Sequence, residues 1–175
     1  RNNVTVYQDA SLHEAESEKA ELDLPRLLSF IRTVEPEAIS FLREGADMNY
    51  ALAMEGIRHP FGHAVGRALF RRVCVDFDES FYNDPATHMP ANACEWGKIL
   101  VTAAADARMG GCNMPARCTM GDGNQGITAT NPVTAAAQVW HIDDDRALRA
   151  AALSHLVSIY IKSNIGKTTP FCMCG

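Results

Sequence analysis

A glycine-rich stretch from Asp106 to Val133 constrains this chain more than any other part of its sequence. It holds five glycines and two prolines and shows almost no periodic apolar pattern, whereas the segments on both sides are rich in alanine and helical in character. Glycine permits positive φ angles and lets a ligand approach the backbone closely. A long polar loop between two apolar helices is uncommon unless it has a role. The stretch therefore predicts a functional loop, and a buried connector whose glycines serve only turns is the alternative.

The composition is that of a folded chain with one sizeable core. The 175 residues are 47 % apolar and 21 % charged, and the formal net charge is −5. An acidic balance argues against a general nucleic-acid partner, and no apolar run approaches the length of a membrane span. We expect a cytoplasmic protein with neither a nucleic-acid nor a membrane partner.

Six cysteines raise the question of disulfides or metal ligands. A core-rich chain without a secretory signal fits reduced thiols better than disulfides, and the absence of a Cys-x-x-Cys pair argues against a zinc ribbon. We expect four of them to be small buried apolar residues, namely Cys74, Cys94, Cys112 and Cys118. The chain starts at Arg1 and stops just after Cys172-Met173-Cys174, so we expect a fragment of a longer protein.

The expected fold is mainly α, a helical bundle-like domain with a short β remnant at its N-terminus. Val4–Tyr7 is a strand candidate, so residues 1–21 are interpreted as the end of an upstream β region with an acidic loop, and residues 22–175 as the helical domain. Helix start signals occur at Asp23, at Glu35-Pro36, at Asn131-Pro132 and at Asp143. Longer helices are expected over 91–107 and 146–165. The second is apolar nearly all round, which predicts a central core helix packed against 91–107.

Several polar residues are candidates for a binding or catalytic site. Asn124 and Gln125 offer amide groups that suit the carboxylate and ammonium of an amino acid, and exposed backbone N–H groups near Gly123 and Gly126 could hold a carboxylate. Hydrogen bonding within the loop explains the two amides equally well. Arg108 is either a carboxylate clamp or a structural partner of Asp106.

Two histidines are candidate general bases. His63 and Arg67 are four residues apart, which on a helix places them on one face and could aim them at an anionic substrate. A capping histidine and a surface arginine are the alternative. His155 lies in the middle of an apolar helix, where it is either a hydrogen-bonded core histidine or a general base.

Three sequence blocks resemble one family. They are Asp106-Ala107-Arg108-Met109-Gly110-Gly111, then Gly121-Asp122-Gly123-Asn124-Gln125-Gly126-Ile127, then Ser154-His155-Leu156 through Ile159-Tyr160-Ile161-Lys162 to Cys172-Met173-Cys174. They resemble the L-cysteine desulfidase branch of the serine-dehydratase-like alpha-domain family and, more distantly, the alpha domain of iron–sulfur L-serine dehydratases. The family usually has Ser where Asp122 stands and Gly where Met173 stands.

The resemblance implies a lyase of amino-acid catabolism that depends on a [4Fe–4S] cluster. Such enzymes remove a thiol or hydroxyl group from L-cysteine or L-serine and give pyruvate and ammonia. The turn that holds Cys172 and Cys174 would contribute cluster ligands, and the family's other ligands lie outside this chain. The chain by itself should then hold no complete cluster and release no pyruvate. Its partners would be a small L-amino acid and either another copy of the chain or the remaining segments of the same protein.

Two other functions remain open on the sequence alone. One is a non-catalytic helical scaffold that has no cluster. The other is a binding module that uses the Asn124-Gln125 loop to recognise a small amino acid.

Overall fold

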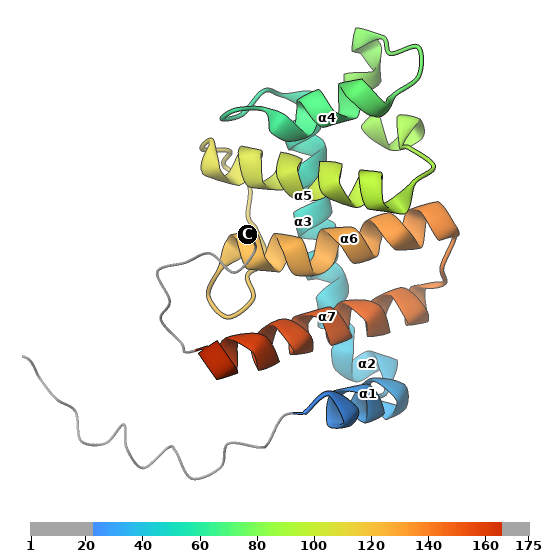
Figure 1. The fold of residues 1–175 in the computed structure, drawn as a ribbon, viewed down its shortest axis with the longest axis vertical. Coiled ribbons are helices and arrows are strands. Elements are labelled where there is room, and N and C mark those ends of the chain that lie inside the picture. The colour runs from blue at the N-terminus through green and yellow to red at the C-terminus, as the bar shows by residue number, and fades with distance from the viewer. Residues whose placement is uncertain (1–22, 166–175) are drawn as a thin grey trace, which may run out of the picture.

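The computed structural model describes residues 23–165, and these residues are mainly α-helical, as predicted (Figure 1). The described part contains α1 Leu24–Thr33, α2 Pro36–Ile39, α3 Phe41–Arg58, α4 Val65–Val73, the short 3-10 helices η2 Glu79–Asn83 and η3 Pro85–His88, α5 Ala93–Met109, α6 Gly123–Trp140 and α7 Asp144–Ile165. The strand candidate Val4–Tyr7, the acidic loop and the cysteines Cys172 and Cys174 lie outside the described residues.

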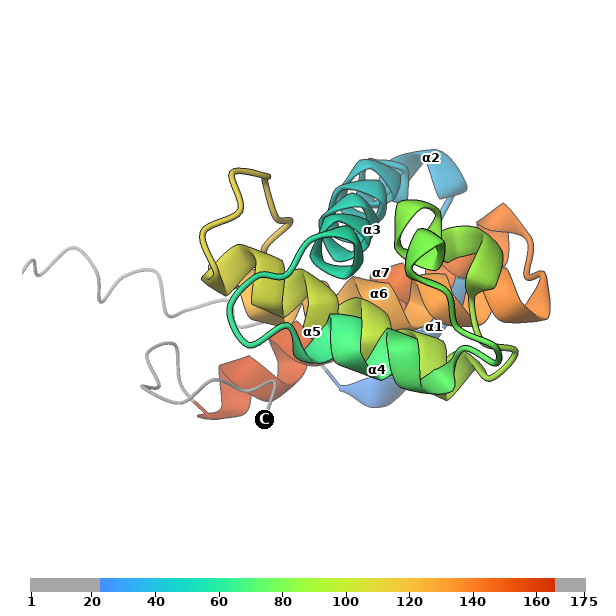
Figure 2. The same ribbon diagram turned by 90° about the horizontal axis from the view of Figure 1, so that it is seen from above.

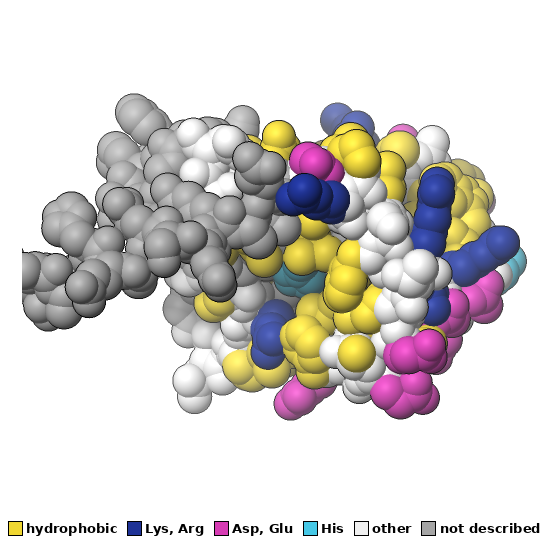
Figure 3. Space-filling view, turned by 90° about the horizontal axis from the view of Figure 1, so that it is seen from below, with side chains coloured by type: hydrophobic (Ala, Val, Ile, Leu, Met, Phe, Trp, Pro, Cys, Tyr) yellow, Lys and Arg dark blue, Asp and Glu magenta, His cyan; other side chains and the backbone are white. Residues whose placement is uncertain are grey.

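Four helices lie side by side in the order α4, α5, α6 and α7, and α3 runs across one face of this layer (Figure 1). The view from above shows α3 on one side of the layer (Figure 2). The pair α1 and α2 packs against α7 at the end of the layer. Seen from that end, hydrophobic side chains reach the surface between charged groups (Figure 3). No helix among residues 23–165 is both long and apolar enough to cross a membrane.

Small residues bring α3, α4 and α5 together. A Cβ atom built on Gly56 of α3 would lie 2.0 Å from the carbonyl oxygen of Ala103, and one on Gly66 of α4 would lie 2.3 Å from the amide nitrogen of Ala103. The backbone of α5 is therefore in contact with α3 and α4 at the same residue. The aromatic side chains of Phe70 and Trp96 are fully buried beside this junction and fill the main core.

The predicted helix starts at Asp23 and Asp143 are confirmed. The Asp23 carboxylate accepts a hydrogen bond from the backbone of Arg26, and the Asp143 carboxylate accepts one from the backbone of Arg146. Both contacts are N-caps, in which a side-chain oxygen accepts from an N–H group that has no partner inside the helix.

The predicted extent of the glycine-rich loop is wrong. The loop ends at Asp122, which caps α6 by accepting a hydrogen bond from the backbone of Gln125. Pro132 therefore lies inside α6, and Asn131 is no cap but a buried residue whose amide donates to the carbonyl oxygens of Leu100 and Asn49. A proline ring inside a helix removes one backbone hydrogen bond, and here the exposed face of α6 accommodates it.

The predicted position of the last helix is also wrong. α7 packs on α6 and on the α1–α2 pair, so that α6 separates it from α5 (Figure 1). Within the described side chains of α7, the buried ones are Leu148, Ala151, Ala152 and His155. Leu153 and Leu156 are partly buried against the small cluster that α7 forms with α1, α2 and α3, and Ile161 is exposed. An apolar pattern on several sides of α7 therefore did not place it at the centre of the fold.

Two of the four cysteines that we predicted to be buried are exposed. Cys94 and Cys118 lie at the surface, and Cys74 and Cys112 are half-buried. Cys94 falls in the first turn of α5 on its outer side, and Cys118 falls in the loop before α6, where the backbone and not the side chain packs inward.

Candidate functional site

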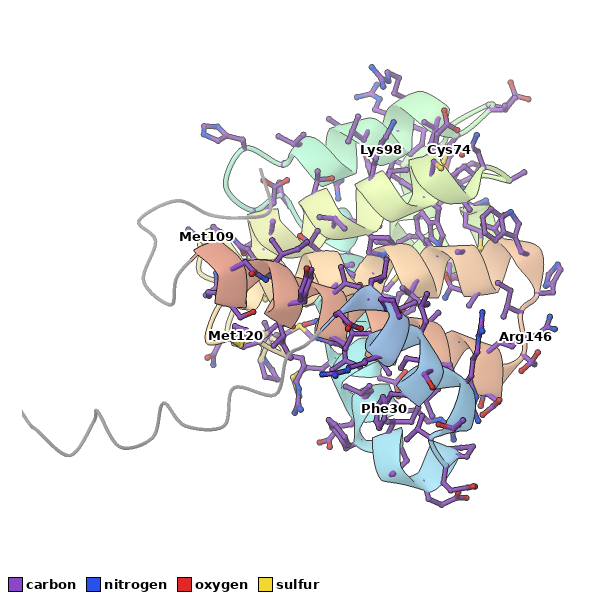
Figure 4. The ribbon with its side chains drawn as sticks, turned by 60° about the horizontal axis from the view of Figure 1, so that its bottom comes forward. Phe30, Cys74, Lys98, Met109, Met120 and Arg146 are labelled. Carbon is purple, nitrogen blue, oxygen red and sulfur yellow. The ribbon has the colours of Figure 1, made fainter. Side chains whose placement is uncertain are left out.

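The turn from Thr119 to Asp122 joins the glycine-rich loop to both α6 and α7. Thr119 and Asp122 exchange two backbone hydrogen bonds of 3.0 Å, and Met120 and Gly121 have positive φ angles. From α7, the Lys162 ammonium donates to the carbonyl oxygen of Met120 at 2.9 Å. Met120 lies at the same end of the molecule as Met109, the last residue of α5 (Figure 4). The turn is thus held where the ends of three helices meet.

Arg108 lies directly over the first residue of α6. A Cβ atom on Gly123 would stand 2.4 Å from the Nε atom of Arg108, so glycine at this position lets the guanidinium lie directly against the start of the helix. The guanidinium also donates to the side-chain oxygen of Asn124 at 3.1 Å. Asp106, the alternative partner of Arg108, instead accepts a hydrogen bond from the backbone N–H of Gly66 at 3.0 Å. The structure therefore brings together Arg108, Gly123 and Asn124.

The segment before the turn is fixed by a buried amide on α3. Asn49 is fully buried; its side-chain oxygen accepts from the N–H of Arg117 at 2.9 Å, and its NH₂ group donates to the carbonyl oxygen of Arg117 and to the hydroxyl of Thr130. Gly126 of α6 lies against the same backbone, because its Cβ atom would be 1.8 Å from the Arg117 carbonyl oxygen. Gly126 thus permits close packing of the loop on α6.

His155 is the buried titratable group of this region. Its Nδ1 atom lies 2.6 Å from the hydroxyl of Thr119, and its Nε2 atom has no hydrogen-bond partner within the described residues. Burial lowers the pKa of His155, and the positive charge of Arg117 lowers it further. Both causes disfavour the imidazolium form and favour the neutral imidazole in the contact with the turn.

A pH dependence of stability follows from this shift. Because the pKa of His155 is lower in the folded state than its ordinary value of 6.5, the folded protein binds fewer protons than the unfolded chain as the pH falls below 6.5. The stability that the neutral His155 contributes is fully present above pH 6.5 and is lost as the pH falls from 6.5 through the lowered pKa. We expect His155→Asn to show a shallower loss of melting temperature on acidification than the unmodified chain. His141→Asn is the control, because His141 is exposed, and an equal acid dependence in all three proteins would contradict the assignment.

Gln125 points away from Asn124 although the two are adjacent in sequence. Gln125 is buried, and its side-chain oxygen has no partner within the described residues. Its side chain lines a groove of about 450 Å³ between α6 and α7, together with Ser154 and Ser158. The two amides, both candidates for one amino-acid site on the sequence, therefore lie on two different surfaces.

His63 and Arg67 do not share a helix. α4 begins at Val65, after Ala64 in a left-handed conformation, so His63 lies in the preceding turn and is exposed. Arg67 donates to the carbonyl oxygen of Ile57 at 2.8 Å, and its guanidinium lies 3.3 Å from the centre of the Tyr82 ring. These contacts join α4 to α3 and η2, at a distance along the layer from the turn at Thr119 (Figure 1).

The described residues do not fit an iron–sulfur cluster. Within residues 23–165, no group of three or more His, Cys, Asp and Glu side chains is placed to hold a metal ion. Burial raises the pKa of the Cys74 thiol, which opposes the thiolate form that a cluster requires. Cluster ligands would have to come from Cys172, Cys174 and residues beyond the described part.

Four residues of this region were not identified from the sequence, namely Asn49, Arg117, Thr119 and Lys162. A signal existed for Asn49, since it stands in the buried stripe Leu42, Gly45, Asn49, Leu52 of α3 and a polar residue in such a stripe needs a partner. Thr119 and Lys162 had no comparable signal, because their contacts join segments that are far apart in the chain.

Comparison with known proteins identifies the family of the whole chain. The serine dehydratase alpha chain family matches the chain over residues 1–175. A UPF0597 protein of Aliivibrio salmonicida is 34 % identical over 176 residues, which cover 98 % of this chain and 39 % of the relative. A UPF0597 protein of Actinobacillus pleuropneumoniae serotype 3 is 37 % identical over 158 residues, which cover 90 % of this chain and 34 % of the relative.

The chain thus spans little more than a third of the length of these relatives. No solved structure is detectably similar to it. The match over the whole chain confirms the family predicted from the three sequence blocks: the chain belongs to the serine dehydratase alpha chain family.

Proposed function

We propose that this chain is part of a lyase that eliminates a thiol or hydroxyl group from a small L-amino acid, L-cysteine or L-serine, to give pyruvate and ammonia. Membership of the serine dehydratase alpha chain family supports the reaction class. The relatives are more than twice as long as the part that matches, which supports a catalytic unit assembled from this chain and further segments of the same protein.

The observation that carries the proposal is the position of Arg108 at the N-terminus of α6. A helix N-terminus has a partial positive charge and free N–H groups, so it favours anions and disfavours a cation. Here the cation is nevertheless held there, by contact with Gly123 and by a hydrogen bond to Asn124. The first turn of α6 contains no acidic residue, and the carboxylate of the cap Asp122 already accepts from the backbone of Gln125.

An anion bound between the guanidinium and the helix end would be attracted by both. The carboxylate of an amino acid has suitable charge and geometry, since arginine binds carboxylates with two parallel hydrogen bonds. In this proposal Arg108 and the N–H groups of α6 bind the carboxylate, and Asn124 holds the guanidinium in place.

An elimination also needs a base that removes the proton from Cα. His155 is favoured over His63 for this role, because burial lowers the pKa of His155 toward the neutral base form and its Nδ1 atom lies 2.6 Å from the hydroxyl of Thr119, whereas His63 is an exposed residue of the turn before α4. A [4Fe–4S] cluster, when bound, would supply Lewis acidity toward the leaving group. Its proposed ligands Cys172 and Cys174 lie outside the described residues, and the roles of Arg108 and His155 do not depend on it.

We expect Arg108→Gln to raise KM for the amino acid by about 10- to 100-fold, because removal of a charge-assisted hydrogen bond to a carboxylate costs about 1.5–3 kcal/mol. The measurement is pyruvate release from L-cysteine and L-serine under nitrogen, on the full-length gene product purified without oxygen. Arg72→Gln is the control, since Arg72 is an exposed arginine of α4.

Iron content, acid-labile sulfide content and pyruvate release, measured on the same preparation, test the reaction class. Amino-acid binding without pyruvate release would instead support the binding-module alternative. An unchanged KM in an active Arg108→Gln enzyme would show that the carboxylate binds elsewhere.

A further inference from the structure

The face of the α5–α6–α7 layer that points away from α3 is open and apolar. One groove of about 460 Å³ lies between α5 and α6, and two of about 450 Å³ each lie between α6 and α7. The grooves share residues, so they form one surface, here called the open face. Its principal lining residues are Cys94, Val101, Pro132, Ala136, Trp140, Ala150, Leu153, Val157 and Ile161.

On its α7 side, the open face has the ridges and grooves of a helix-packing surface. Small residues recur every four positions at Ala150, Ser154 and Ser158, and branched apolar residues recur beside them at Leu153, Val157 and Ile161. Rows with a spacing of four residues are the ridges and grooves into which the side chains of another helix fit. The small row allows the backbone of a partner helix to approach closely.

The open face also contains an unsatisfied hydrogen-bond acceptor. Gln125 lines the α6–α7 groove, and its side-chain oxygen is buried without a partner within the described residues. A buried polar atom without a partner destabilises a fold. Rotation of the Gln125 amide toward a polar group on a covering partner would remove that penalty.

The charged side chains that line the three grooves are Lys98 and Arg146. Arg146 is paired with Asp143 at 3.7 Å, so its charge is balanced within the chain. Lys98 is exposed on α5, and a partner with a carboxylate near it would be attracted. The side chain of Trp140 is 63 % exposed at the edge of two of the grooves, and a large aromatic group in that position is typical of an interface.

We propose that a helix from the rest of the same enzyme covers the open face. This inference rests on the proposal that the chain is part of a longer protein, and the length of the relatives outside the matched part supplies the occupant. The partner helix presents apolar side chains to the α6–α7 groove, a polar group to the Gln125 amide, and a carboxylate near Lys98.

The test uses the two tryptophans as reporters. Trp96 is fully buried in the core and serves as an internal reference, and Trp140 lies on the open face. Acrylamide quenching of fluorescence is measured on the full-length gene product and on this 175-residue chain, each also as Trp140→Phe so that the Trp140 signal is obtained by difference. We expect Trp140 to be quenched strongly in the chain alone and to lose most of that quenching in the full-length protein.

A matched pair of variants then assigns the protection to this face. Ala150→Glu places a bulky anion in the small row, where the partner helix is expected to approach closely, and Ala51→Glu places the same group at an exposed position of α3. In the full-length protein Ala150→Glu should restore the quenching of Trp140, and Ala51→Glu should not. Both variants of the chain alone should keep its melting temperature, because both alanines are exposed.

Two results would overturn the proposal. Equal quenching of Trp140 in the chain and in the full-length protein would show that the open face stays uncovered. A chain that forms dimers with protected Trp140, and that becomes monomeric with Ala150→Glu, would show that the occupant is a second copy.

Discussion

Replacement of Gly56 by alanine is expected to destabilise the chain by more than about 3 kcal/mol, at or beyond the upper end of the range for overpacked cores. The added Cβ atom would meet the carbonyl oxygen of Ala103 at 2.0 Å and its carbonyl carbon at 2.6 Å. Both are backbone atoms of α5, so no side-chain rotation can relieve the clash. The helices α3 and α5 would have to separate, and their contact contains most of the main core.

The measurement is urea denaturation followed by circular dichroism, with the free energy of unfolding extrapolated to zero denaturant. Gly97→Ala is the control, because Gly97 is also a buried glycine within a helix of this core, but its nearest neighbour to an added Cβ is 3.4 Å away. Alanine in place of glycine inside a helix stabilises by about 0.5–1 kcal/mol where space permits. Similar effects of the two substitutions would show that α3 and α5 do not pack as closely as described.

Replacement of Asn49 by alanine is expected to cost about 2–4 kcal/mol, because buried polar groups are then left without partners. Asn49 is fully buried and makes three hydrogen bonds, two to the backbone of Arg117 and one to the hydroxyl of Thr130. Its loss removes the anchor of the segment that leads into the turn at Thr119. The amide protons of that turn should then exchange faster with solvent than those of α5.

Asn49→Leu separates the lost hydrogen bonds from the cavity, since leucine restores apolar volume but cannot pair with the Arg117 backbone. It should remain clearly destabilised. Asn113→Ala is the control, because Asn113 is an exposed residue of the same loop, and surface substitutions usually change stability by less than about 0.5 kcal/mol. A cost for Asn49→Ala as small as that of Asn113→Ala would mean that the amide does not hold the loop.

The sequence by itself determined the helical class and the family. The caps at Asp23 and Asp143 are local contacts between residues three positions apart, and such contacts can be predicted from residue types alone. The three sequence blocks also identified the family that the whole-chain match confirms. They directed attention to Arg108 and Asn124, which the structure places within hydrogen-bond distance of each other.

The start of α6 shows where local signals were insufficient. Asp122 and Asn131 are both good caps, and the proline at 132 favoured the second. The structure uses Asp122, because Asn131 is buried and donates to two carbonyl oxygens from α3 and α5. Long-range hydrogen bonds from the buried NH₂ group of Asn131 outweighed the local preference of proline for a first turn.

Only the tertiary structure decided which face each polar side chain serves. Asn124 and Gln125 are neighbours in sequence, yet one binds Arg108 from α5 and the other lines the groove beside α7. His155 gained its contact with Thr119 and its lowered pKa only when α7 packed against the turn. The apolar pattern of α7 specified a helix but not its neighbours, because periodicity gives the width of an apolar surface and does not identify the partner that covers it.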